Sequence, residues 1–157
     1  KLVSHRHFQF LLQQEIDRST RYHHPLSLIM LDIDRFKDIN DKNGHQAGDL
    51  VLIEVSRILK QSCREVDTVA RYGGEEFVLI LPETDLTGAA LVAERLRNRI
   101  ENCVTCYQDK VLRITVSLGV TSFPEQANSK ESLIMAADKA MYLSKEKGRN
   151  RVSVSVN

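Results

Sequence analysis

The sequence has few of the residues that interrupt or cross-link a polypeptide chain. It contains seven glycines, three prolines and three cysteines in 157 residues. Disordered chains are typically enriched in proline, glycine and charge of one sign, so this composition indicates a folded globular protein. The length allows one well-buried core and is short for two, which predicts a single domain over residues 1–157.

Long apolar runs and an excess of one charge are also missing. The apolar stretches are a handful of residues long, as in 77–81, whereas crossing a bilayer takes roughly 20. Lys plus Arg number 22 and Asp plus Glu number 21. We therefore expect no membrane contact by this domain and no nucleic-acid binding driven by overall charge, and any anion site has to be local.

The odd number of cysteines argues against a disulfide framework. Cys63, Cys103 and Cys106 fit a reducing compartment, which predicts a cytoplasmic domain. Cys103 and Cys106 form a C-x-x-C, but no second pair or nearby His completes a zinc site, which favours strand packing. The first residue is Lys and no signal peptide follows, so we expect a piece of a longer protein with its sensory or regulatory part, and any membrane anchor, upstream.

The spacing of apolar residues predicts an α+β fold. Period-3.6 patterns predict helices, and short apolar runs between turn signals predict strands. The expected helices cover residues 7–22, 36–41, 47–62, 87–101 and a last one from Ser129 or Ser132 to 147. The expected strands cover 26–33, 68–72, 76–81, 112–121 and 152–156. This mixed order predicts a largely antiparallel central sheet flanked by helices.

Acidic residues stand at two predicted strand ends. Asp32 closes a buried strand, and Glu75 and Glu76 directly follow the turn at Gly73 and Gly74. If these strands are neighbours, the carboxylates converge at one rim of the sheet. Mg²⁺ prefers hard oxygen ligands and needs only a few of them from the protein. A glycine pair lets a nucleotide approach the backbone closely. The alternative is an ordinary hairpin with solvated acids.

Four motifs in order decide between these alternatives. They are D-I-D-R-F-K-D-I-N-D-K-N-G-H-Q-A-G-D at 32–49, R-Y-G-G-E-E-F at 71–77, S-L-G-V at 117–120 and G-R-N-R at 148–151. Together the motifs resemble the GGDEF family of diguanylate cyclases, of which G-G-E-E-F is a frequent variant, over about residues 5–154. The resemblance implies a ferredoxin-like palm, as in polymerases and nucleotide cyclases. It also implies that a homodimer joins two GTP into cyclic di-GMP and releases pyrophosphate.

The resemblance also assigns the metal site. It implies that Mg²⁺, or Mn²⁺ in its place, is held by the side chains of Asp32 and Glu75 and by the backbone carbonyl of Ile33. Glu75 or Glu76 would accept the proton of the attacking ribose 3′-hydroxyl. The second acid of D-I-D, Asp34, is interpreted as the N-cap of the following helix rather than as a metal ligand.

Substrate residues follow from the same resemblance. Asn40 and Asp49 match the pair that reads guanine, and a carboxylate can accept from guanine N1–H and the 2-amino group, which adenine does not offer as a pair. Asp49 could instead be an acid stabilised by a helix dipole. His45 either contacts substrate or shapes its turn, and Phe36 lines the nucleotide pocket or packs beneath it.

Three basic residues match the family positions that hold phosphates. They are Lys37, Lys145 and Arg149. A lysine on a helix surface is usually just solvated. The i, i+4 spacing of Lys145 and Arg149 near a helix end nevertheless predicts a local cationic patch in a neutral protein.

A second site is expected upstream of the glycine turn. Arg64 and Asp67 form an R-x-x-D motif, which in this family is the inhibitory site for the product. Arg can bind a phosphate or a guanine edge with two hydrogen bonds. The alternative is a surface ion pair. Arg95 on the following helix is a further candidate for this site, against a solvated helix face.

One family segment is missing, and three other functions are alternatives. The family usually begins with a D-x-L-T segment that links it to its regulator, and here only S-H-R-H at 4–7 precedes the first helix. A degenerate domain would only bind cyclic di-GMP through Arg64 and Asp67. A cyclase with a mixed adenine-guanine product is disfavoured by Asp49. A purely structural module would leave the acidic and basic cluster unexplained.

Overall fold

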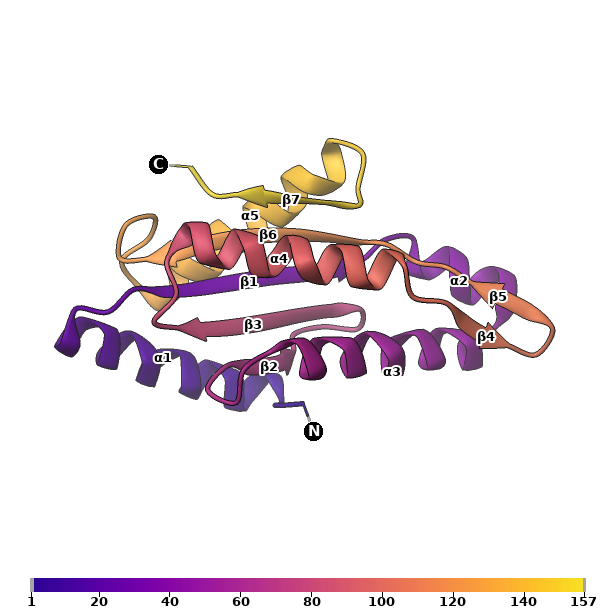
Figure 1. Ribbon diagram of the computed structural model, residues 1–157, viewed down its shortest axis with the longest axis horizontal. Coiled ribbons are helices and arrows are strands. Elements are labelled where there is room, and N and C mark those ends of the chain that lie inside the picture. Colours follow the sequence, from indigo (N-terminus) through magenta and orange to yellow (C-terminus); the bar gives the residue numbers. More distant parts are fainter. Residues whose placement is uncertain (1, 157) are drawn as a thin grey trace.

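The computed structural model describes residues 2–156, which fold around a five-stranded sheet (Figure 1). The helices are α1 (His5–Tyr22), α2 (Phe36–Asn43), α3 (His45–Ser62), α4 (Leu86–Glu101) and α5 (Lys130–Glu146). The strands are β1 (Leu26–Ile33), β2 (Thr68–Arg71), β3 (Glu76–Pro82), β4 (Thr105–Tyr107), β5 (Lys110–Leu112), β6 (Val116–Phe123) and β7 (Arg151–Val154).

The strand order of the sheet is β2-β3-β1-β6-β7. Strand β1 lies in the middle and pairs antiparallel with β3 and β6, β2 pairs antiparallel with β3, and β7 runs parallel to β6. The order of β2, β3, β1 and β6 is that of a ferredoxin-like sheet. The predicted α+β class with a largely antiparallel sheet is confirmed.

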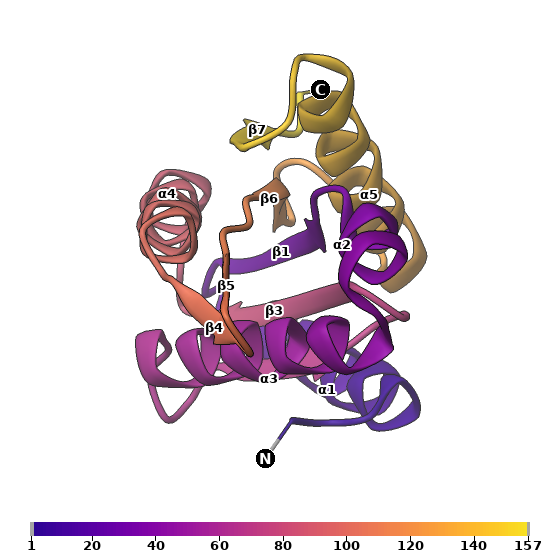
Figure 2. The ribbon, with the colours of Figure 1, turned by 90° about the vertical axis from the view of Figure 1, so that its right-hand side faces the viewer.

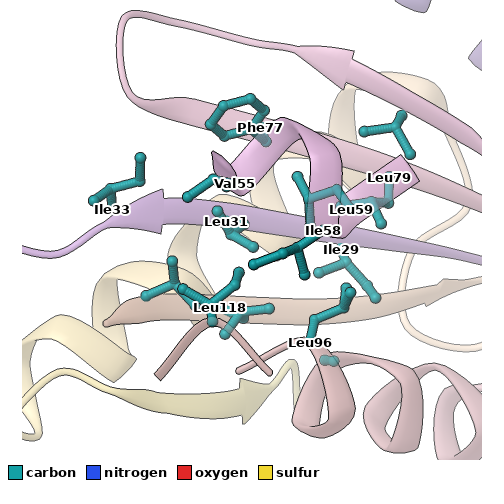
Figure 3. Close-up of a cluster of buried hydrophobic side chains, with 14 of the residues drawn as sticks. Ile29, Leu31, Ile33, Val55, Ile58, Leu59, Phe77, Leu79, Leu96 and Leu118 are labelled. Atoms are coloured by element: carbon teal, nitrogen blue, oxygen red, sulfur yellow. The ribbon is translucent and has the colours of Figure 1, made fainter. Parts of the chain in front are cut away.

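Helices cover both faces of this sheet. Helices α3 and α4 cover one face and α1 and α5 the other (Figure 2). Side chains of β1 alternate between the two cores, with Leu31 in the α3–α4 core shown in Figure 3 and Met30 in the α1–α5 core. A strand buried on both faces explains the continuous apolar run in the sequence. Among the helices of residues 2–156, none is long and apolar enough to span a bilayer.

One predicted strand is wrong in its extent. The run 112–121 was expected to be continuous, but β5 ends at Leu112 and β6 begins at Val116. Between them the chain leaves strand pairing, and the carbonyl of Thr115 accepts a 2.9 Å hydrogen bond from the backbone N–H of Asp34. The interruption therefore brings Thr115 to the residue that follows β1.

Close backbone packing fixes α5 on the sheet. A Cβ on Gly119 of β6 would lie 2.2 Å from both the carbonyl oxygen of Ala137 and the backbone nitrogen of Met141. Only glycine allows this approach, because real Cβ contacts are never so short. The position of Gly119 thus sets how the C-terminal end of α5, which carries Lys145, lies over the sheet.

The segment before α1 is attached to strand β2. The N–H of Val3 donates to the carbonyl of Val69 at 3.0 Å, and the N–H of Arg71 donates to the carbonyl of Val3 at 3.1 Å. The ring of Phe8 in α1 meets the ring of Tyr72 edge-on, with centroids 5.9 Å apart. The beginning of α1 and the β2–β3 hairpin are therefore one packed unit.

Candidate active site

The carboxyl end of β1 and the amino end of β3 meet at one rim of the sheet. Asp32 lies opposite Glu76 in the antiparallel register. The N–H of Ile33 donates to the carbonyl of Glu75 at 3.2 Å. The structure thus brings together the acids predicted for metal and proton chemistry and the backbone of Ile33.

The acids at this rim lie close to one ammonium group. The Nζ atom of Lys145 is 3.0 Å from Oδ1 of Asp32, whose side chain is 13% exposed. Burial raises the pKa of Asp32, while the hydrogen bond and charge of Lys145 act in the opposite direction. Burial also raises the pKa of Glu76, and the charge of Asp32 adds to this rise. Partly buried acids that share a single cation favour the binding of another one.

The donor set at this rim fits magnesium. Lys145 already places a positive charge against Asp32, which marks the carboxylate as a cation site. Within residues 2–156, no group of three or more His, Cys, Asp or Glu side chains is arranged to hold a metal alone. Mg²⁺ keeps several waters and takes further ligands from substrate phosphates, so Asp32, Glu75 and the carbonyl of Ile33 suit it better than a closed zinc site.

The predicted helix-capping role of Asp34 is wrong. The N-cap of α2 is Arg35, with φ 55° and no side-chain capping bond. The Asp34 carboxylate turns inward instead and accepts from the hydroxyls of Thr115 and Ser117, at 2.7 and 2.6 Å, and from the N–H of Asn150 at 3.0 Å. A buried carboxylate needs such donors, and the exposed start of α2 could not supply them all.

The signature turn is wider than the glycine pair alone. The β2–β3 hairpin is confirmed, but its strands end at Arg71 and begin at Glu76, and neither Gly73 nor Gly74 has a left-handed φ. A Cβ on Gly74 would meet nothing within 4 Å, so the surface there is open to a ligand. The guanidinium of Arg71 donates to the carbonyls of both glycines and lies 5.6 Å from the ring centroid of Phe77.

Arg71 directly precedes the turn and was not among the residues predicted for the site. Carbonyls in a turn lack strand partners, so an adjacent arginine is a natural donor to them. That signal was available in the sequence. Its contacts show that Arg71 holds the shape of the turn.

The corner between α2 and α3 gathers the predicted guanine residues. A Cβ on Gly48 would lie 1.9 Å from Oδ1 of Asn40 and 3.1 Å from the ring of Phe36. That Oδ1 atom is buried and has no hydrogen-bond partner within residues 2–156. A buried oxygen without a donor is a natural contact point for a ligand.

Asp49 follows Gly48 and faces solvent. It helps to form a cavity of about 480 Å³ whose other lining residues are Leu52, Ile53, Ser56 and Arg71. The cavity is thus lined by one carboxylate, one guanidinium and the side of α3. Phe36 packs beneath this corner, against the α3–α4 core.

The predicted phosphate-binding residues lie at two places. Lys145 is half-buried at the acidic rim, and Arg149 lies in the turn after α5 with φ 66°. Lys37 and His45 are exposed, as the second residue of α2 and the first residue of α3. The structure therefore places Lys145 beside the predicted metal ligands and leaves Lys37 and His45 in solvent.

The family described as "Diguanylate cyclase, GGDEF domain" matches residues 1–151. The chain belongs to the GGDEF domain family. It is 46% identical over 156 residues to Diguanylate cyclase A of Treponema denticola, a match that covers 97% of this chain and 42% of that protein. The chain spans less than half the length of the curated relatives it matches.

Solved GGDEF structures superpose on the whole fold. The GGDEF domain of DgcB from Caulobacter crescentus in complex with c-di-GMP gives a TM-score of 0.94 at 32% identity, over 99% of this chain and 90% of that one. The active GGEEF domain of a diguanylate cyclase from Vibrio cholerae gives 0.93 at 30% identity, over 100% and 99%. These likenesses bear out the expected fold class.

The R-x-x-D residues of this GGDEF chain are bonded to each other. Nη2 of Arg64 lies 2.8 Å from Oδ1 of Asp67, and the backbone N–H of Arg64 donates to Oδ2 at 2.8 Å. Nη2 also donates to the carbonyl of Pro82 at 2.9 Å. The side chain of Asp67 is 4% exposed and that of Arg64 is 54% exposed. The motif thus forms an ion pair with one open guanidinium edge, and its role as a product site stays a prediction.

Arg95 lies next to the same loop. Its Nη2 donates to the carbonyl of Ser62 at 3.2 Å, two residues before Arg64. Arg95 is exposed. The structure therefore brings the three residues predicted for inhibition to one surface region.

Proposed function

We propose that this GGDEF domain condenses two GTP into cyclic di-GMP and releases pyrophosphate. The observation that carries the proposal is the cluster of Asp32, Glu75 and Lys145 beside the signature turn of a GGDEF chain. Relatives that match over nearly the whole chain are named diguanylate cyclases. A structural neighbour is described in complex with c-di-GMP.

The acidic rim would hold Mg²⁺ or Mn²⁺ through Asp32, Glu75 and the carbonyl of Ile33. The bound cation would neutralise triphosphate charge and lower the pKa of the attacking ribose hydroxyl. Lys145 and Arg149 would bind phosphate oxygens, and Lys37 is proposed to do so from α2. These cations would orient the triphosphate through charge-assisted hydrogen bonds.

Each half-reaction forms one bond and breaks one. The 3′-oxygen of one GTP bonds to the α-phosphorus of the other, the bond from that phosphorus to the bridging oxygen breaks, and pyrophosphate leaves. The hydroxyl proton would go to Glu75 or Glu76, which lie at the amino end of β3 beside the end of β1. A second, identical step closes the ring.

Guanine would be read at the α2–α3 corner. The buried Oδ1 of Asn40 has no partner within residues 2–156, and Asp49 borders the adjacent cavity. Asp49 would accept from guanine N1–H and the 2-amino group, a pair of donors that adenine lacks. Gly73 and Gly74 would give the nucleotide access to the turn, and His45 would lie at the edge of this site.

The reaction requires two domains. Residues 2–156 form one set of acids and one guanine corner, whereas the product joins two nucleotides, each of which attacks the other. A two-fold homodimer with opposed active-site rims supplies both halves. Cyclic di-GMP would inhibit through Arg64, Asp67 and Arg95. The guanidinium groups of the two arginines are exposed and lie near the other end of β3 from this rim.

The competing function is a domain that only binds cyclic di-GMP through R-x-x-D. That function needs no acids at the β1–β3 rim, so the Asp32–Lys145 cluster disfavours it.

One experiment separates the two functions. The protein is incubated with GTP or ATP in Mg²⁺, over a wide dilution series, and the products are identified by mass. We expect cyclic di-GMP from GTP and no cyclic product from ATP. The specific activity should rise as the protein concentration rises. Binding of cyclic di-GMP without any product from GTP would contradict the proposal, and a specific activity independent of dilution would contradict the dimer.

A further inference from the structure

The Asp34 carboxylate is saturated with hydrogen bonds. Asp34 is 5% exposed, and its Oδ1 accepts from Ser117 Oγ at 2.6 Å and from Lys145 Nζ at 3.3 Å. Its Oδ2 accepts from Thr115 Oγ1 at 2.7 Å and from the N–H of Asn150 at 3.0 Å. A carboxylate offers about four acceptor sites. Four donors from three parts of the chain therefore occupy Asp34, which leaves no lone pair for a metal.

These donors connect segments that are far apart in sequence. Thr115 lies directly before β6 and Ser117 at its start, Lys145 lies in the last turn of α5, and Asn150 lies in the turn that leads to β7. Asp34 itself follows β1. A single buried charge thus joins the metal-ligand strand to both sides of the phosphate-binding segment.

The turn after α5 has an uncommon backbone. Gly148, Arg149 and Asn150 have φ values of 120°, 66° and 47°. Consecutive left-handed residues other than glycine are disfavoured and persist where the surroundings hold them. Two bonds do so here, from the N–H of Asn150 to Asp34 and from the N–H of Arg149 to the carbonyl of Ser144 at 2.9 Å.

The side chain of Asn150 fastens the same turn to α4. It accepts from Arg97 at 2.9 Å and donates to Glu101. The direction of the Arg149 side chain is thus set by the backbone and side-chain contacts of the neighbouring Asn150. Within residues 2–156 the guanidinium of Arg149 has no hydrogen-bond or ion-pair partner, so it can meet a ligand.

We propose that Asp34 is a positioning residue that holds Lys145 and the Arg149 turn in place for the triphosphate of GTP. Lys145 lies between Asp32, at 3.0 Å, and Asp34, at 3.3 Å. When a cation binds Asp32, Asp34 retains the ammonium at the rim, where it meets phosphate. This inference rests on the proposed function only in taking GTP as the ligand.

The test compares nucleotides with and without phosphates. Asp34→Asn keeps the volume, removes the negative charge and replaces one acceptor oxygen with an NH2 group that faces two of the four donors. We expect its affinity for GTP to fall about tenfold or more, because charge-assisted bonds to phosphate depend on the positions of both cations. The affinity for guanosine, followed by NMR titration, should stay within about twofold, because base contacts are untouched.

Repeating both titrations in EDTA distinguishes positioning from metal binding. Substitution of a positioning residue weakens GTP binding with and without Mg²⁺, whereas substitution of a metal ligand weakens it only with Mg²⁺. Asp38→Asn, an exposed acid on α2, is the matched control and should bind GTP like the parent protein. Thr115→Val removes one donor and should give a smaller loss of the same kind if Asp34→Asn folds poorly.

Three results would overturn the inference. They are a loss confined to Mg²⁺, an equal loss for guanosine and GTP, and unchanged GTP binding in both Asp34→Asn and Thr115→Val. The outcome is independent of turnover. If the parent protein binds GTP without making product, and Asp34→Asn weakens that binding, the proposed function fails and the positioning role stands.

Discussion

The two ends of strand β3 hold acidic groups in opposite electrostatic conditions. At its start, Asp32 and Glu76 lie together and burial raises the pKa of each. Near its end, the buried carboxylate of Asp67 is matched by the backbone and guanidinium of Arg64. The start and end of β3 are about 20 Å apart, since strand residues rise roughly 3.3 Å each. One end is short of positive charge, and the other is already neutralised.

This difference indicates how ligands act at each end. A cation or a magnesium nucleotide adds charge that the active-site rim lacks, so binding there relieves repulsion. A ligand at the R-x-x-D end gains the open edge of Arg64, but contacts to Asp67 would have to replace existing hydrogen bonds. The first end therefore fits the proposed metal and nucleotide site, and the second can meet the proposed product only through the open edge of Arg64.

The largest expected effect comes from removing one acid at the rim. Glu75→Gln should lower turnover by about a thousandfold or more, because a neutral amide is a poor ligand for the divalent cation. Glu65→Gln, an exposed glutamate within R-x-x-D, is the matched control and should keep full turnover. Rates of product formation and circular dichroism would be measured for both variants. Undiminished turnover in Glu75→Gln would contradict the active-site assignment.

A smaller effect is expected at the other end. Arg64→Ala should raise the concentration of cyclic di-GMP needed for half-inhibition by about tenfold, since a charged bidentate contact is lost. The initial rate should change less than about twofold. Arg57→Ala removes an exposed arginine of α3 and serves as control. The same inhibition curve for all three proteins would show that the Arg64–Asp67 pair is structural only.

The smallest expected effect is on the free energy of unfolding, which should change in opposite directions when an acid is neutralised at each end of β3. Asp67→Asn should lower the free energy of unfolding by about 1 kcal/mol, because the buried carboxylate loses the charge that pairs with the half-exposed guanidinium of Arg64. Asp32→Asn should instead raise it at pH 7 without Mg²⁺. The raised pKa of Asp32 means that its ionised form opposes folding, so this cost grows as pH rises from the ordinary value of 3.8 through the raised one.

Urea unfolding at pH 7 and at pH 3 measures both changes. The gain from Asp32→Asn should disappear at pH 3, where the carboxyl is protonated in either state. If Asp32→Asn destabilises the protein at pH 7 as much as Asp67→Asn does, the two ends of β3 are electrostatically alike and the comparison fails.

Local patterns in the sequence predicted the elements well. The bounds of β1 were predicted to the residue, and the β2–β3 hairpin and the helix after Ser129 were found as expected. Apolar periodicity and capping residues act over a few positions, so a sequence shows them directly. The sequence motifs also predicted that Asp32 and Glu75 lie at one rim of the sheet. Their roles, the single-domain boundaries and the cytoplasmic location stay predictions.

Long-range contacts account for what the sequence did not show. The donors to Asp34 come from Thr115 and Asn150, 81 and 116 residues away, so a helix-capping pattern was the only local interpretation. The same contact interrupts the strand that was expected to run continuously to 121. The partners of Arg71 are near in sequence, but they depend on the shape of a four-residue turn.

The attachment of Val3 to β2 has a mechanical consequence. The two backbone hydrogen bonds of Val3 involve the residues on either side of Ala70. One of these residues, Arg71, also donates from its side chain to the carbonyls of the signature turn. Only Ser4 lies between Val3 and α1, and only Tyr72 lies between Arg71 and Gly73. The segment before α1 and the signature turn are therefore connected through the backbone hydrogen bonds of Val3 and the side chain of Arg71.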